Sequence, residues 1–104
     1  MGNLEVLQKA KDLISDPENW CRHALMKDVK GPDGVKTGVQ FCSLGAIIQI
    51  TNLGQQWSPA MDTLTKAARK LGVPDVVTLN NFSSHEKVME MFDLAICMEE
   101  CNNA

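Results

Sequence analysis

Apolar side chains recur every three or four residues over much of the chain, which is the spacing of a helix with one buried face. Residues 3–15 follow this pattern until Pro17 approaches, and proline disfavours helical geometry in the residue before it. Residues 58–71 show the clearest stripe, which ends at Gly72, and residues 83–101 show another. These three stretches predict amphipathic helices. Their expected N-terminal caps are Asn3, Ser58 and Ser83, the last in a Ser-x-x-Glu capping pattern.

Residues 44–53 differ because their apolar side chains surround the axis instead of forming a stripe. A helix that is apolar all round is a central helix. Ser43 is its expected N-cap, and Gly45 would let the backbone of another segment approach it closely. Cys42 stands immediately before this helix and marks the junction with the preceding segment.

Two short segments, residues 20–27 and 36–42, flank the sequence Gly-Pro-Asp-Gly at residues 31–34. Proline presets φ and glycine supplies positive φ, so this tetrapeptide predicts a turn and its flanks predict a two-stranded hairpin. An isolated hairpin is marginal in water, so we expect Trp20 to anchor it on the helices. The β-branched run at residues 76–79 predicts a short strand or an extended packed loop.

These elements predict one globular domain over residues 1–104, of α+β class and mostly α. It has four helices, with a small β-hairpin between the first and second helices. The length allows a buried core without disulfides or a structural metal. Apolar residues make up 44% and charged residues 22% of the chain, which is ordinary for a folded protein.

Charge and cysteine usage narrow the function classes. The net charge of −3 argues against a dedicated nucleic-acid binder, which normally has a basic face. The longest apolar run is far too short to span a bilayer, and the N-terminus lacks the pattern of a signal peptide. We therefore expect a cytoplasmic protein that does not bind membranes, with its four cysteines as free thiols. We expect no cofactor.

Several short motifs occur along the chain in a definite order: Trp20, then Cys42-x-Leu44-Gly45-Ala46, then Asn80, and His85 at the start of the last predicted helix. In this order the chain resembles an uncharacterised family of small proteins from bacteria and their phages, over about residues 7–96. That family has a Trp, a Cys-Ala-Leu-Gly-Ala stretch, a Trp-Asn-Asp triplet, and Thr-His or Ser-His. Leu79 and Asn81 replace the Trp and Asp of the triplet. The resemblance implies a helical domain with a small β-element and no particular activity.

One set of residues predicts nucleophilic chemistry, namely Cys42 with His85 and either Asn80 or Asn81. Amides at the start of the helix after Cys42 could stabilise its thiolate, while a histidine activates the thiol and an asparagine orients the ring. The alternative is that Cys42 is a small buried core residue and that His85 caps a helix.

Cys21-x-His23 and Cys97-x3-Cys101 lack the paired spacing of structural zinc sites, so we predict no metal site. The second pair lies with Leu94 on the outer side of the last predicted helix, where a modest apolar patch is compatible with a homodimer.

Two regions are candidates for binding a partner. Gln56 and Trp57 lie in the loop before the third predicted helix. Trp57 either packs into the core as a hydrophobic staple or, if it is exposed, is a natural binding hot spot. A basic strip follows on that helix, formed by Lys66, Arg69 and Lys70. We therefore expect a small protein-binding accessory or regulatory module. The alternatives are a Cys-dependent enzyme using Cys42 and His85, and a weak nucleic-acid-associated protein using the basic strip.

Overall fold

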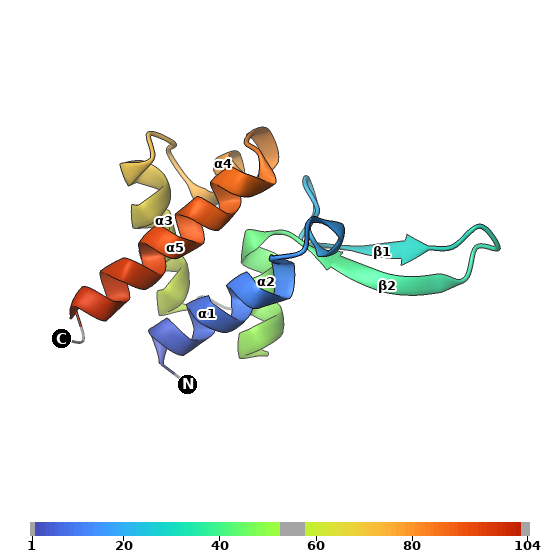
Figure 1. Ribbon diagram of the computed structural model, residues 1–104, viewed down its shortest axis with the longest axis horizontal. Coiled ribbons are helices and arrows are strands. Elements are labelled where there is room, and N and C mark those ends of the chain that lie inside the picture. The colour runs from blue at the N-terminus through green and yellow to red at the C-terminus, as the bar shows by residue number, and fades with distance from the viewer. Residues whose placement is uncertain (1, 53–57, 103–104) are drawn as a thin grey trace.

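A computed structural model of the protein describes residues 2–52 and 58–102 (Figure 1). Over these residues it is an α+β fold, mostly helical, with a two-stranded antiparallel hairpin between the first two α-helices, as predicted. The predicted number of helices is wrong, because the described residues form five α-helices instead of four. The elements in chain order are α1 (Asn3–Ile14), the 3-10 helix η1 (Pro17–Asn19), β1 (Met26–Lys30), β2 (Lys36–Phe41), α2 (Ser43–Thr51), α3 (Pro59–Lys70), α4 (Val76–Phe82) and α5 (His85–Asn102).

The additional helix is α4, at the place where a strand or extended loop was predicted. Asp75 caps it, since the side-chain Oδ1 accepts a hydrogen bond from the N–H of Thr78 at 2.7 Å. Val76, Leu79 and Asn80 are the buried positions, at the spacing of one helix face. The cap and this buried face outweigh the β propensity of the two valines.

The helix starts differ from the expected caps in three of four cases. Ser58 caps α3 as predicted, because its Oγ accepts the N–H of Ala60. Helix α1 begins at Asn3 with Gly2 as its cap, and Cys42 rather than Ser43 caps α2. At α5 the Oγ of Ser84, not Ser83, accepts the N–H of Lys87.

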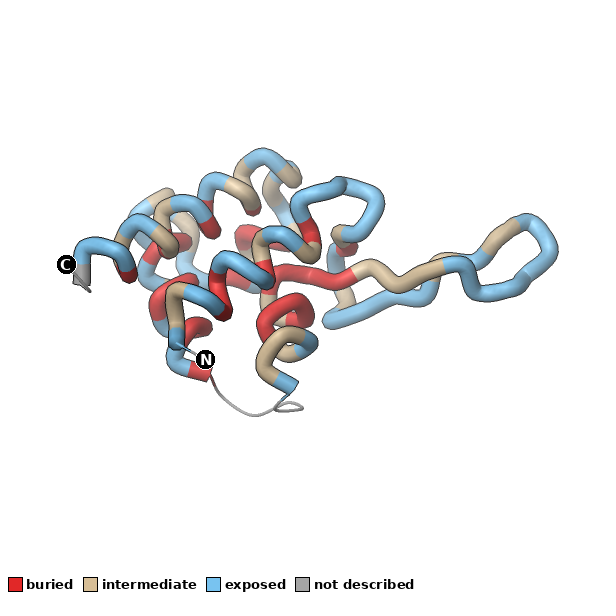
Figure 2. The backbone as a smooth tube through the Cα atoms, turned by 60° about the horizontal axis from the view of Figure 1, so that its bottom comes forward, coloured by how far each residue is buried: buried red, intermediate tan, exposed pale blue. Residues whose placement is uncertain are grey.

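The helices enclose one core. Helix α1 packs against α2 and α5, while α3 packs against α5, and the buried stretches of the backbone face inward (Figure 2). The centre contains Leu7, Ile14, Ile47, Leu64 and Phe92, all fully buried. Helix α2 is less enclosed than predicted, because Gln49 is exposed and Ile50 only half-buried. None of the described helices is both long and apolar enough to cross a membrane.

The hairpin extends away from the helices, so the molecule measures about 50 × 28 × 21 Å (Figure 1). Its register pairs Met26 with Phe41 and Val29 with Gly38, with an irregularity after Val29. The first strand begins later than predicted, at Met26. The segment before it instead forms the base of the hairpin, where Trp20 makes a parallel bridge to Phe41.

A candidate functional site at the base of the hairpin

The base of the hairpin lies directly against the first turn of α2. The N–H of Cys42 donates to the carbonyl O of Leu25 at 3.1 Å. A Cβ atom on Gly45 would lie only 1.9 Å from this same oxygen. The absence of a side chain at position 45 therefore permits the contact. This is the close approach of another backbone segment that the sequence predicted for Gly45.

Asn80 joins three segments of the chain at this point. Its Oδ1 accepts hydrogen bonds from the indole N–H of Trp20 at 2.8 Å and from the N–H and Oγ of Ser43 at 2.9 and 2.7 Å. Its Nδ2 donates to the carbonyl O of Cys21 at 3.0 Å and to Oδ1 of Asn81 at 3.3 Å. The side chain is almost completely buried, so Asn80 holds the hairpin base, α2 and α4 together.

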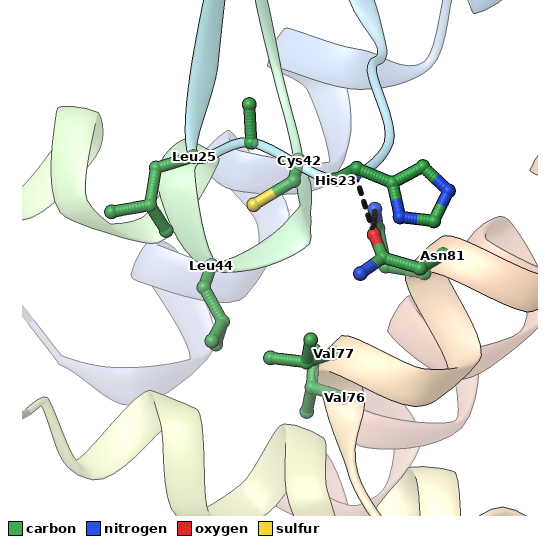
Figure 3. A pocket seen from close by; sticks show the side chains of 9 residues that line it. His23, Leu25, Cys42, Leu44, Val76, Val77 and Asn81 are labelled. Atoms are coloured by element: carbon green, nitrogen blue, oxygen red, sulfur yellow. Dashed lines mark hydrogen bonds between the residues drawn. The ribbon is translucent and has the colours of Figure 1, made fainter.

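Asn81 supports the loop between η1 and β1. Its Oδ1 accepts the N–H of His23 at 2.8 Å, the bond drawn in Figure 3. His23 has a φ of 64°, in the left-handed region that few side chains adopt, and this bond helps to hold it there. The imidazole of His23 extends outward and contacts the ring of Phe82 edge-on, with 5.7 Å between centroids.

A cavity of about 310 Å³ lies between these segments (Figure 3). This volume is at the small end of the range of ligand-binding sites in proteins. Most of its wall is apolar, formed by side chains from the hairpin base, α2 and α4. The lining residues are His23, Ala24, Leu25, Cys42, Leu44, Val76, Val77, Asn80 and Asn81.

The polar groups in the wall of this cavity are largely occupied by bonds within the protein. Asn80 uses both its oxygen and its nitrogen, and the oxygen of Asn81 accepts two bonds. Among the described residues, no buried side-chain nitrogen or oxygen lacks a partner. Among the side-chain nitrogen and oxygen atoms of the wall, the amide nitrogen of Asn81 and the ring of His23 are left for an occupant. The cavity therefore suits a mainly apolar group.

Cys42 lies in the cavity wall, but its thiol is held in the neutral form. Burial raises the pKa of Cys42, and the opposing hydrogen bonds from the N–H groups of Gly45 and its neighbours do not compensate. The Gly45 N–H lies 3.3 Å from Sγ, so the helix amides reach the sulfur as predicted. Burial also raises the pKa of Cys21, with a further contribution from Cys42.

We expect Cys42 to react slowly with thiol reagents at neutral pH. Cys97 and Cys101 are exposed, so a Cys97→Ser, Cys101→Ser variant isolates the two buried thiols. In this variant the rate of reaction with a disulfide reagent should be low at pH 7 and rise about tenfold per pH unit, because only the thiolate reacts. Rapid labelling of Cys42 at pH 7 would contradict the neutral thiol and favour the nucleophile hypothesis.

The structure brings together Cys42, Asn80 and Asn81, whereas His85 is not in the cavity wall. The Nε2 of His85 lies 2.7 Å from the carbonyl O of Ile14, and its ring packs on Trp20 with 5.4 Å between centroids. Trp20 also donates to Asn80, so it connects the histidine to the asparagine. The histidine at the cavity is His23 instead, and in Figure 3 its ring extends away from the sulfur of Cys42.

Three of the predicted partner-binding residues, Lys66, Arg69 and Lys70, are not among the residues that line the cavity. Lys66, Arg69 and Lys70 are exposed on α3, where Nε of Arg69 donates to the carbonyl O of Pro74. Gln56 and Trp57 fall outside the described residues. On α5, Cys97 and Cys101 are exposed and Leu94 is half-buried. The described residues contain no group of three or more His, Cys, Asp or Glu that could hold a metal ion.

Sequence reasoning missed the cavity because it missed α4. An available signal was Asp75 directly before the apolar run, because aspartate is a favoured N-cap residue. A helix from Val76 would have placed Val76, Leu79 and Asn80 on one face and Val77 outside it.

The fold and the cavity define a small α+β domain in which a projecting hairpin and a short helix enclose an apolar site. Residues 3–97 match the sequence profile of a family of unknown function, DUF6197. The chain belongs to this family, in agreement with the resemblance to an uncharacterised family found in its motifs. No curated protein and no solved structure matches the chain.

Proposed function

We propose that the protein is a small protein-binding module whose cavity receives an apolar side chain of a partner. The observation that carries this proposal is the apolar surface around the cavity mouth. Leu25, Val77 and Phe82 are exposed by 41%, 52% and 79% of their surface. Leu25 and Val77 line the cavity, and Phe82 contacts the ring of the lining residue His23. Apolar patches that surround a pocket are typical of protein interaction sites.

A polypeptide fits this surface better than a free small molecule. The cavity has room for about one large side chain, whereas the exposed apolar residues extend beyond its mouth. A peptide with one anchoring side chain would fill the cavity and cover the surrounding residues. Binding energy at protein interfaces is concentrated in such anchors, with aromatic residues prominent among them.

A titration followed by NMR tests the proposal. The probe is an acetylated nonapeptide with a central Phe and serine flanks, and the matched peptide has Ser in place of the Phe. We expect the Phe peptide to shift the amide signals of His23, Leu25, Leu44 and Val77, and the Ser peptide to leave them unchanged. The substitution Val77→Asp places a charge at the mouth and should weaken binding by about tenfold or more.

The control is Val35→Asp, because Val35 is similarly exposed but lies in the hairpin turn away from the cavity. This variant should bind the Phe peptide as the parent does. Equal binding by the Val77→Asp variant, or shifts confined to residues outside the cavity wall, would refute the proposal.

The two alternative functions predicted from the sequence, a Cys-dependent enzyme and a nucleic-acid-associated protein, stay predictions. A Cys-dependent enzyme has less support than a binding module, because burial raises the pKa of Cys42 and His85 is engaged with Ile14 and Trp20. A nucleic-acid-associated role would rest on the basic strip of α3 in a chain of net charge −3.

A further inference from the structure

We propose that the partner segment carries acidic residues next to its apolar anchor, and that these residues contact the basic segment 22–27 at the base of the hairpin. This inference rests on the proposed function, since it specifies the chemistry of the peptide that the cavity receives. Arg22, His23 and Lys27 lie in this segment, all three are exposed, and residues 22–27 contain no carboxylate. The segment is therefore locally basic in an acidic chain.

The two permanent cations are available to a partner. Arg22 and Lys27 take no part in the ion pairs found among the described residues. The guanidinium of Arg22 lies 4.7 Å from the centre of the Trp20 ring and donates to the carbonyl O of Ser83. These contacts fix its position while leaving other N–H donors for a carboxylate.

Two carboxylates, one next to this segment in the chain and one next to the cavity wall, are engaged within the protein. Asp28, the next residue after Lys27, forms an ion pair with Lys36 at 3.3 Å on the hairpin. Asp75 lies at the start of α4, beside Val76 and across the cavity from the hairpin base. Its carboxylate accepts the Thr78 N–H, which holds its pKa below the usual range. On the α4 side the positive charge of Arg69 acts on Asp75 and offsets its negative charge, whereas segment 22–27 on the hairpin side is basic. An acidic flank therefore fits toward the hairpin.

The same charges disfavour a second copy of the chain as the occupant. In a two-fold dimer built on this surface, the mouth of one copy faces the mouth of the other. The basic segments of both copies would then lie in the same interface, and this accumulation of positive charge weakens association. A separate polypeptide of complementary charge has no such penalty.

The experiment compares three acetylated nonapeptides that share a central Phe and differ only in flanks of Glu, Ser or Lys. Affinities are measured by NMR titration at about 50 mM and about 500 mM NaCl, which separates electrostatic from apolar contributions. At low salt we expect the Glu peptide to bind about tenfold more tightly than the Lys peptide, and the difference to shrink at high salt.

Lys27→Glu should reduce the preference for Glu flanks about fivefold or more. The matched control is Lys30→Glu, which makes the same change at the outer end of β1 and should leave the preference intact. Equal binding of the three peptides, or an unchanged preference in Lys27→Glu, overturns this inference while leaving the proposed function in place. Binding of none of the peptides overturns both. Self-association of the protein that competes with the Glu peptide would identify a second copy as the occupant and also overturn it.

Discussion

Replacing Gly45 with alanine is expected to lower the free energy of unfolding by about 3 kcal/mol or more. The added Cβ would lie 1.9 Å from the carbonyl O of Leu25, and the carbonyl carbon is only 2.8 Å away. These are backbone atoms, so a rotamer change cannot relieve the overlap. Moving Leu25 would break the hydrogen bond that its oxygen accepts from Cys42 and would open the hairpin base.

Urea and thermal unfolding followed by circular dichroism measure this effect, with a fall in Tm of more than about 10 °C expected. Gly38→Ala is the matched control, because a Cβ at position 38 meets nothing within 4 Å and the φ there is not positive. That variant should be as stable as the parent. If the Gly45→Ala variant were as stable as the parent, this result would contradict the close contact between α2 and the backbone of Leu25.

The second large effect is expected for Asn80→Ala, which should lower the free energy of unfolding by about 3–5 kcal/mol. It removes the acceptor for the indole N–H of Trp20 and for two donors of Ser43, and the donor to the carbonyl of Cys21. Each buried group left without a partner costs about 1–3 kcal/mol. The loss should therefore exceed that of any single hydrogen bond at this site.

Trp20→Phe separates one of these bonds from the rest, because it keeps most of the ring but removes the N–H. The double variant Trp20→Phe, Asn80→Ala should then show a coupling energy of about 1 kcal/mol in a double-mutant cycle. Asn19→Ala, at an exposed neighbouring position, is the control and should be close to neutral. Additive effects in the cycle would mean that Trp20 and Asn80 do not interact.

The sequence predicted the elements whose signals are local. The stripe and Ser58 cap of α3, and the Gly-Pro-Asp-Gly turn of the hairpin, depend on residues close together in the chain. Helix α4 was missed because Val76 and Val77 have β propensity, and the deciding factor was the side chain of Asp75 together with burial of Leu79. Burial of one face is a tertiary effect that a short β-branched run does not reveal.

The residues of the candidate site were likewise predicted only in part. Cys42, Asn80 and Asn81 were singled out from sequence, and the structure places all three at one cavity. Their order in the chain could not indicate which histidine would join them. The position of His23 depends on its left-handed backbone and its bond to Asn81, 58 residues away. The role of Asn80 as a shared hydrogen-bond partner depends equally on contacts distant in sequence.

The projection of the hairpin also has a consequence for how the chain tolerates changes in length. The base of the hairpin is fastened to the helical body through Trp20 and Cys21, which hydrogen-bond to Asn80, while the outer part extends into solvent. Inserting or deleting one residue in each strand beside the turn would alter the reach of the hairpin without disturbing the core. The helical body of this chain should therefore tolerate hairpins of different length.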